Sequence, residues 1–370
     1  MYITTCISQF KNLFLKVVNL LRTGRSGFQE RHCTSIKDNV SPQEEDIMAT
    51  IKAFIKKHKV LTYYGMVFTI SWGSLLLIAS GPYQIPGTKE QVDRLFPIAL
   101  LSLFAGPSVS GILMNGLVSG RAGLRELFSR LLQWRVAARW YAIAVLFAPL
   151  LVTAVLLALS LISTKYLPGL ITTSDKVGLL VFGIAWGLIG GGLLEELGWT
   201  GFAVPNLRKR YSIITTGLIV GILWGIWHFL IAFWSSGSLA GETPLAIFVA
   251  GFLIFYLGAL PAFRILLVWI YDRTGNLPVV MLMHASLSSS TLILQPLAVG
   301  MPFLIWNLVL TAVIWSVVAA VTVANRGQLE RGRVDQTRQN CRLTTACCGR
   351  NFALLLMLSV TYFLTEIINH

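Results

Sequence analysis

The stretch GGGLLEELGWTGFAVPNLRKR, residues 190–210, decides the fold and raises the question of function. Two adjacent carboxylates, Glu195 and Glu196, follow glycines and leucines, and a basic cluster ends the stretch. The apolar part begins near residue 177, so the run is long enough to cross the hydrocarbon core of a bilayer. Because a charged side chain at that depth is costly, the two glutamates predict a functional site inside a membrane-spanning helix.

The composition of the whole chain is typical of a membrane protein. Of its 370 residues, 55% are hydrophobic and 12% are charged. Lipid offers no partner to an open backbone, so apolar runs of roughly 18 to 26 residues predict an all-α, polytopic transmembrane helical bundle. About eight spanning helices are expected. They fall near residues 60–81, 95–118, 140–163, 177–197, 212–234, 245–270, 277–297 and 301–324.

The excess of basic residues is a topology signal. Lys and Arg number 30 against 16 Asp and Glu. They gather before the first run, between the second and third, after the fourth and after the eighth, all on one side of an eight-helix protein. The positive-inside rule makes that side the cytoplasm, so we expect a multi-pass protein of the cell membrane with both termini cytoplasmic. The expected partner of this charge is the lipid bilayer and not nucleic acid.

The chain divides into four predicted segments. Residues 1–47 read as a polar and amphipathic extension, and residues 48–325 as the transmembrane domain. Residues 326–349 form a basic cytoplasmic tail, and residues 350–370 an apolar segment that is interfacial or an extra helix. Within the domain, residues 120–140 alternate leucines with arginines, which predicts either a surface helix or a basic connector. All cysteines lie in the tails, so no cysteine metal site is expected in the bundle.

Few ionisable residues fall inside the predicted spans, namely Glu195, Glu196, His228, Arg264 and His284. We explain Arg264 by snorkelling to a boundary. On a helix Glu195 and Glu196 point about 100° apart, and two carboxylates this close do not ionise independently, which suits proton exchange. One histidine on an apolar helix is more often a packing residue. Two histidines and a glutamate pair on three successive helices favour a shared polar site.

Glycines surround the glutamate pair. Gly187, Gly191 and Gly192 precede it, and Gly198 and Gly201 follow it. Small residues at this spacing allow helices to approach closely in a membrane. We therefore expect a tight interior around the carboxylates that excludes lipid and holds a water molecule.

Three motifs occur in order along the chain. They are EELGWTG at residues 195–201, WGIWHF at 224–229 and HASLS at 284–288. Their order and spacing resemble the CPBP family of intramembrane proteases, the CAAX prenyl protease 2-like or Abi family, relatives of the type II CAAX prenyl endopeptidases. The pattern of that family is Glu-Glu-x-x-x-Arg, aromatic-x-x-x-His, and His-x-x-x followed by Asn or a similar residue. The resemblance implies an endopeptidase that cleaves a membrane-associated peptide or protein within the membrane.

The resemblance also implies a role for each motif residue. Glu195 would activate a water molecule as general base, and His228 would hold that water. His284 and Ser288 would stabilise the oxyanion, while Glu196 would support the site without attacking.

Two positions depart from the family pattern. Thr200 stands where the family has arginine, so Glu196 is either protonated or paired elsewhere. Ser288 stands where asparagine is common and reaches less far. These departures favour one alternative, a catalytically silent member that acts as a binding or immunity protein. A proton-coupled transporter that uses both glutamates is a second alternative, which the lack of an internal repeat disfavours.

Family members are often described as metalloproteases, so the resemblance also raises the question of a metal. Glu195, His228 and His284 could form a three-ligand zinc site with one open position. The sequence has no HExxH pattern, which would place two histidines on one helix face. We expect a metal-independent glutamate mechanism without a cofactor and keep zinc as the alternative.

Overall fold

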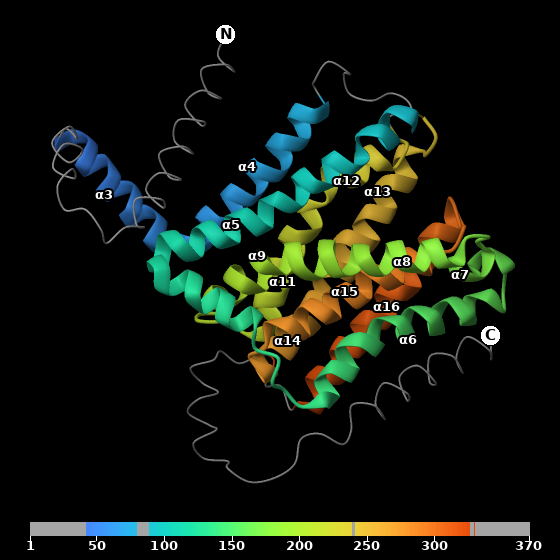
Figure 1. Cartoon of the computed structure of the whole chain (residues 1–370). Helices are drawn as coiled ribbons and strands as arrows, with labels where there is room; N and C mark the ends of the chain where they lie inside the picture. Colours follow the sequence, from blue (N-terminus) through green and yellow to red (C-terminus); the bar gives the residue numbers. More distant parts are fainter. Residues whose placement is uncertain (1–41, 80–88, 239–240, 326–328, 330–370) are drawn as a thin grey trace. The chain divides into compact units, whose positions relative to one another are not determined.

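The computed structural model describes residues 42–79, 89–238, 241–325 and 329 (Figure 1). This part of the chain is helical and contains no strand. Two compact units, residues 1–54 and 55–370, divide the chain. Helix α3, Pro42–Lys57, begins in the first unit, and the second unit contains all of the predicted spans. The predicted extension up to residue 41, most of the basic tail and the segment 350–370 lie outside the described residues.

Seven helices of the described chain are long and apolar enough to cross a membrane, which confirms the predicted polytopic helical bundle. The seventh predicted span, near residues 277–297, is a shorter apolar helix, α15, Leu277–Ile293. The elements of the bundle are α4 Lys59–Ala79, α5 Lys89–Leu131, α6 Ala138–Ser160, η1 Thr164–Tyr166, α7 Gly169–Thr172, α8 Lys176–Trp186, η2 Gly187–Glu195, α9 Glu196–Gly198, η3 Trp199–Ala203, α10 Val204–Leu207, α11 Ile213–Trp227, α12 Phe229–Ser235, α13 Leu245–Ile254, η5 Phe255–Ala259, α14 Leu260–Thr274, α15 and α16 Met301–Ala324.

Polar residues between the apolar runs set the ends of the motif-bearing helices. The Ser212 hydroxyl accepts a hydrogen bond from the Thr215 amide at 3.0 Å and caps α11. Gly275 ends α14 in the left-handed conformation, with φ of 61°, which glycine adopts more readily than residues with a side chain. Asn276 follows directly and caps α15, because its side-chain oxygen accepts from the Val279 amide at 2.9 Å. A short turn therefore joins these two buried helices.

The fourth span is irregular and longer than predicted. It runs from Lys176 to Leu207 and continues through Pro205, whereas the sequence predicts an end near residue 197. Two of its segments, η2 and η3, are π-helical, and such turns are frequent at functional sites. In this span Glu195 lies beside the next one, because the Trp224 indole of α11 donates to its carboxylate at 2.5 Å.

Helix α15 packs against α6, α8 and η2, while α11 packs along α14 and α4 along α5 (Figure 1). The helix α5 breaks at Gly120, with φ of 62°, and continues as a helical arm to Leu131. On this arm Leu127 is buried and Phe128 is 52% exposed. Residues 120–140 are therefore helical as far as Leu131, and their place at the membrane surface stays a prediction.

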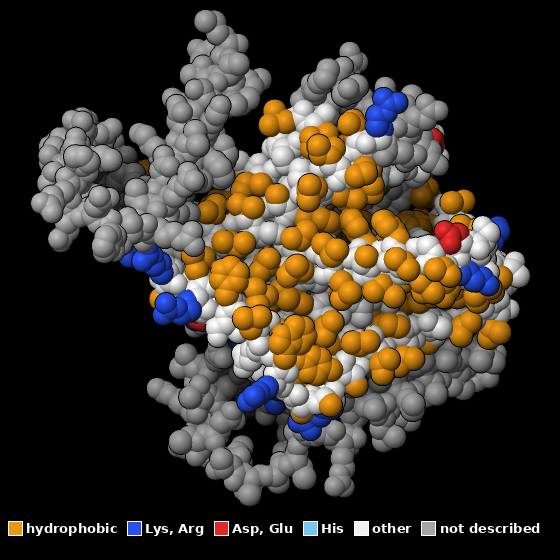
Figure 2. Space-filling model, in the orientation of Figure 1, with side chains coloured by type: hydrophobic (Ala, Val, Ile, Leu, Met, Phe, Trp, Pro, Cys, Tyr) orange, Lys and Arg blue, Asp and Glu red, His pale blue; other side chains and the backbone are white. Residues whose placement is uncertain are grey.

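Hydrophobic side chains cover the outside of the bundle. Figure 2 shows them spread over one face, with Lys and Arg at its margins. Those with more than two fifths of their surface exposed include Leu146, Leu150, Val181, Phe182 and Ile189. A soluble monomer rarely exposes so large an apolar area, whereas lipid tails would cover it. The surface thus agrees with a protein embedded in the bilayer.

Candidate active site

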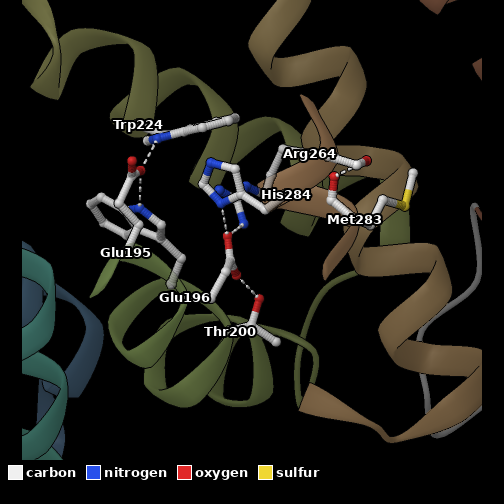
Figure 3. Close-up of polar contacts among 9 residues, drawn as sticks. Glu195, Glu196, Thr200, Trp224, Arg264, Met283 and His284 are labelled. Atoms are coloured by element: carbon white, nitrogen blue, oxygen red, sulfur yellow. Dashed lines mark hydrogen bonds and ion pairs between the residues drawn. The ribbon is translucent and has the colours of Figure 1, made fainter. Parts of the chain in front are cut away.

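The two glutamates of the first motif lie inside the bundle and face different partners (Figure 3). Glu195 ends η2 and is 4% exposed, while Glu196 begins α9 and is fully buried. A buried carboxylate is stable only when hydrogen bonds or opposite charges replace its water. Each of the two has its own set of donors.

Two tryptophan side chains hold Glu195. Its Oε2 atom accepts hydrogen bonds from the indole Nε1 of Trp199 at 3.1 Å and of Trp224 at 2.5 Å. Trp199 lies one turn further along the same helix, and Trp224 belongs to α11 and to the second motif. Because both bonds go to one oxygen, the carboxylate is fixed in orientation while Oε1 has no protein donor in the described chain.

Glu196 is the centre of a charged cluster. Its Oε1 atom lies 2.6 Å from Nη1 of Arg264 and 2.6 Å from Nδ1 of His284, and its Oε2 atom accepts from the Thr200 hydroxyl. These partners come from three segments, η3, α14 and α15. Of the two states that the sequence leaves open for Glu196, the structure shows pairing elsewhere, with Arg264 as the partner.

The snorkelling explanation of Arg264 is wrong. Its side chain is completely buried and forms an ion pair with Glu196 inside the bundle. The guanidinium carbon also lies 4.3 Å from the ring centroid of Trp224, at cation–π distance. A snorkelling side chain would reach the interface, whereas α14 directs this one toward the motif helices.

Trp224 connects the groups of the site. Its indole donates to Glu195, its ring lies edge-on to the His284 ring at 4.8 Å, and its face receives Arg264. Its carbonyl oxygen accepts from Nδ1 of His228 at 2.9 Å. Because a carbonyl only accepts, this contact fixes the proton of a neutral His228 on Nδ1 and makes Nε2 an acceptor.

Ser288 and His284 meet beside Gly191. A Cβ atom on Gly191 would come within 2.4 Å of the Ser288 hydroxyl and 3.1 Å of His284 Nε2. The helix η2 can therefore approach α15 only because residue 191 has no side chain. Gly187 makes the same approach one turn earlier, where a Cβ would lie 2.5 Å from the Ala285 carbonyl oxygen.

The residues of the zinc alternative, Glu195, His228 and His284, each contact other protein groups. Across the described residues, no group of three or more His, Cys, Asp or Glu side chains is placed to hold a metal ion. Nδ1 of His284 is directed at Glu196, and Nδ1 of His228 at the Trp224 carbonyl. The two Nδ1 atoms thus have protein partners, and metal independence stays a prediction.

The structure brings together the side chains that the sequence singles out. Glu195, Glu196 and His284 form the buried part, while His228 and Ser288 are half-buried at its edge. Sequence reasoning gave Arg264 the wrong role and assigned no contact to Trp224 or Trp199. Glu195 and Trp199 are one helical turn apart, and this spacing is the one sequence signal that predicts a contact. Arg264 is 68 residues from its partner Glu196, and Trp224 is 29 residues from Glu195, so no local spacing predicts these contacts.

The comparisons with known proteins fall on this part of the chain. Residues 176–290 match the family model described as type II CAAX prenyl endopeptidase Rce1-like. The chain is also similar to CAAX prenyl protease 2 of Methanococcus maripaludis, with 46% identity over 39 residues. That match covers 10% of this chain and 14% of the relative.

All of the motif residues lie within the matched region, and the motifs had already indicated the same family. Residues 176–290 of this chain thus resemble the Rce1-like family of type II CAAX prenyl endopeptidases, which supports the CPBP family that the motifs indicate.

Proposed function

We propose that this protein is an intramembrane endopeptidase in which Glu195 activates a water molecule to hydrolyse a peptide bond. The observation that carries the proposal is the buried Glu195 carboxylate, whose Oε2 is fixed by two indoles. Trp224 joins this carboxylate to His228, and Trp224 also contacts the ring of His284. Base, water-binding and oxyanion-binding groups are thus connected through one residue, by its indole and its backbone carbonyl.

The attacking water would lie between Glu195 and His228. Oε1 of Glu195 would accept one of its protons, and Nε2 of His228 would accept a hydrogen bond from the other. As the water attacks, its oxygen bonds to the carbonyl carbon and its proton passes to Glu195. The apolar walls around the pair strengthen this step, because the base is not surrounded by competing bulk water.

His284 and Ser288 would stabilise the negative charge that develops on the carbonyl oxygen. His284 Nε2 and the Ser288 hydroxyl both border Gly191, so they can donate to one oxygen atom. Glu196 accepts from Nδ1 of His284 at 2.6 Å and stabilises the ring when Nε2 also carries a proton. When the tetrahedral species collapses, the carbon–nitrogen bond breaks and Glu195 gives its proton to the leaving amine.

The substrate we propose is a membrane-associated peptide or protein, with a prenylated CAAX terminus as its first candidate. The family description supports this choice, and a lipid-anchored chain is already held at the bilayer that surrounds the site. Metal independence and an orientation in the cell membrane with both termini cytoplasmic belong to the same proposal. The basic segments before α4 and after α16 support that orientation.

Purified protein in liposomes tests the function against both alternatives. A farnesylated peptide that ends in a CAAX motif and its unprenylated counterpart are incubated with the protein, and fragments are identified by mass spectrometry. A pH-sensitive dye inside the liposomes reports proton flux. We expect cleavage of the prenylated peptide at one bond without peptide-dependent flux. Binding without cleavage would support the silent relative, and flux without cleavage the transporter.

A further inference from the structure

Arg264 is a buried cation outside all three motifs. The residue lies on α14, and its side chain is 0% exposed. Its Nη1 donates to Glu196, whereas Nε and Nη2 have no hydrogen-bond partner in the described chain. A cation with unpartnered N–H groups in a membrane interior is expensive, so the ion pair and the Trp224 ring must offset its burial. A side chain this costly indicates a role beyond packing.

Thr200 identifies that role. It occupies the position of the family arginine, and its hydroxyl donates to Oε2 of the same carboxylate that Arg264 binds through Oε1. An arginine at position 200 would reach Glu196 from one helical turn away, as Thr200 does. The Glu196 carboxylate thus accepts a hydrogen bond from Thr200 at the motif position and pairs with the positive charge of Arg264 on a different helix.

The oxygen that Arg264 binds is also the one that holds His284. Both nitrogens lie 2.6 Å from Oε1 of Glu196. The direction of the His284 ring, with Nε2 beside Gly191 and Ser288, depends on this acceptor. Without a cation, the low dielectric of the site would favour a protonated Glu196, whose hydroxyl would compete with Nδ1 as a donor.

We propose that Arg264 is a positioning residue that replaces the motif arginine: from α14 it supplies the positive charge that keeps Glu196 able to orient His284. The role of His284 in stabilising the oxyanion rests on the proposed function. The replacement of the motif arginine by Arg264 does not rest on the proposed function, because it concerns only the ion pair of Glu196. The position of the arginine is therefore exchangeable between 200 and 264.

Moving the charge back tests this inference. Arg264→Met, Arg264→Lys and the double variant Thr200→Arg/Arg264→Met are compared with wild type on the farnesylated CAAX peptide. A misplaced oxyanion donor lowers kcat and leaves KM nearly unchanged. We expect kcat to fall about 100-fold in Arg264→Met, to fall less in Arg264→Lys, and to recover at least about 10-fold in the double variant. Arg208→Met, which removes a buried arginine paired with Asp272, is the control and should change kcat less than about threefold.

A second readout separates this inference from the proposed function. In protein labelled with ¹⁵N-histidine, the hydrogen-bonded Nδ1 proton of His284 gives a downfield NMR signal. We expect the signal to disappear in Arg264→Met and to return in the double variant, even if no peptide is cleaved. An unchanged signal and kcat in Arg264→Met would overturn the proposal, as would a folded double variant in which neither recovers. A wild type that leaves the peptide intact contradicts the proposed function alone.

Discussion

Replacing Arg264 by methionine leaves the Glu196 carboxylate buried without its cation, and the loss of stability can be worked out from the geometry. The two charges lie 2.6 Å apart, and both side chains are 0% exposed. Loss of one partner of a buried ion pair costs about 3 to 5 kcal/mol. Glu196 keeps its bond from the Thr200 hydroxyl and can become neutral by binding a proton, so we expect the lower end, about 3 kcal/mol.

Removing the carboxylate as well should relieve part of this loss. In Glu196→Gln/Arg264→Met no unpaired charge is left at this pair, so the double variant should cost about 2 kcal/mol less than the sum of the single variants. The free energy of unfolding is measured in detergent micelles from the fluorescence of the 11 tryptophans. Glu126→Gln is the control, because Glu126 is 72% exposed at 3.9 Å from Arg130, and should cost less than about 0.5 kcal/mol. A coupling below about 0.5 kcal/mol between Glu196 and Arg264 would refute the reasoning.

Three further predictions concern the chemistry of the site. Gly191→Ala places a methyl group 2.4 Å from the Ser288 hydroxyl, so the rate of peptide cleavage should fall at least about 100-fold. Gly65→Ala is the control and should leave the rate unchanged, because no atom lies within 4 Å of the added methyl group. Equal rates in the two variants would show that the oxyanion is bound elsewhere. Trp224→Phe keeps an aromatic ring and removes the N–H that donates to Glu195 at 2.5 Å, so kcat should drop by roughly 10-fold or more. Circular dichroism should show that the variant keeps its native helicity. An unchanged kcat would show that this hydrogen bond does not hold the base. Treatment with 1,10-phenanthroline or EDTA should leave peptide release unchanged, and inhibition that added zinc reverses would contradict the metal-independent mechanism.

The membrane-spanning helices could be predicted from the sequence because they depend on local composition. Each predicted span overlaps an observed helix, since length and hydropathy alone determine what can cross the bilayer. The predicted end of the fourth span, near residue 197, was wrong, because η3 and α10 continue the helix to Leu207. Such irregular turns depend on packing that hydropathy does not contain.

The glutamate pair and the two histidines could also be singled out from the sequence, because ionisable groups are rare inside spans. The residues that pair with these groups could not be predicted in the same way. Arg264 is 68 residues from Glu196 along the chain, and its direction depends on how α14 packs against α11. With Pro261 three residues before it, the same arginine suits a helix boundary equally well from sequence alone. The pairing of charges is thus a property of the folded bundle.

The measurement that tests the proposed mechanism most directly is peptide release by Glu195→Gln under single-turnover conditions in liposomes. The amide keeps the size of the side chain and can still accept from Trp199 and Trp224, but it cannot take a proton from water. We expect the rate of release to fall at least about 10³-fold while binding of the farnesylated peptide and the unfolding free energy stay near their wild-type values. Release by Glu195→Gln within about tenfold of wild type would show that another group activates the water.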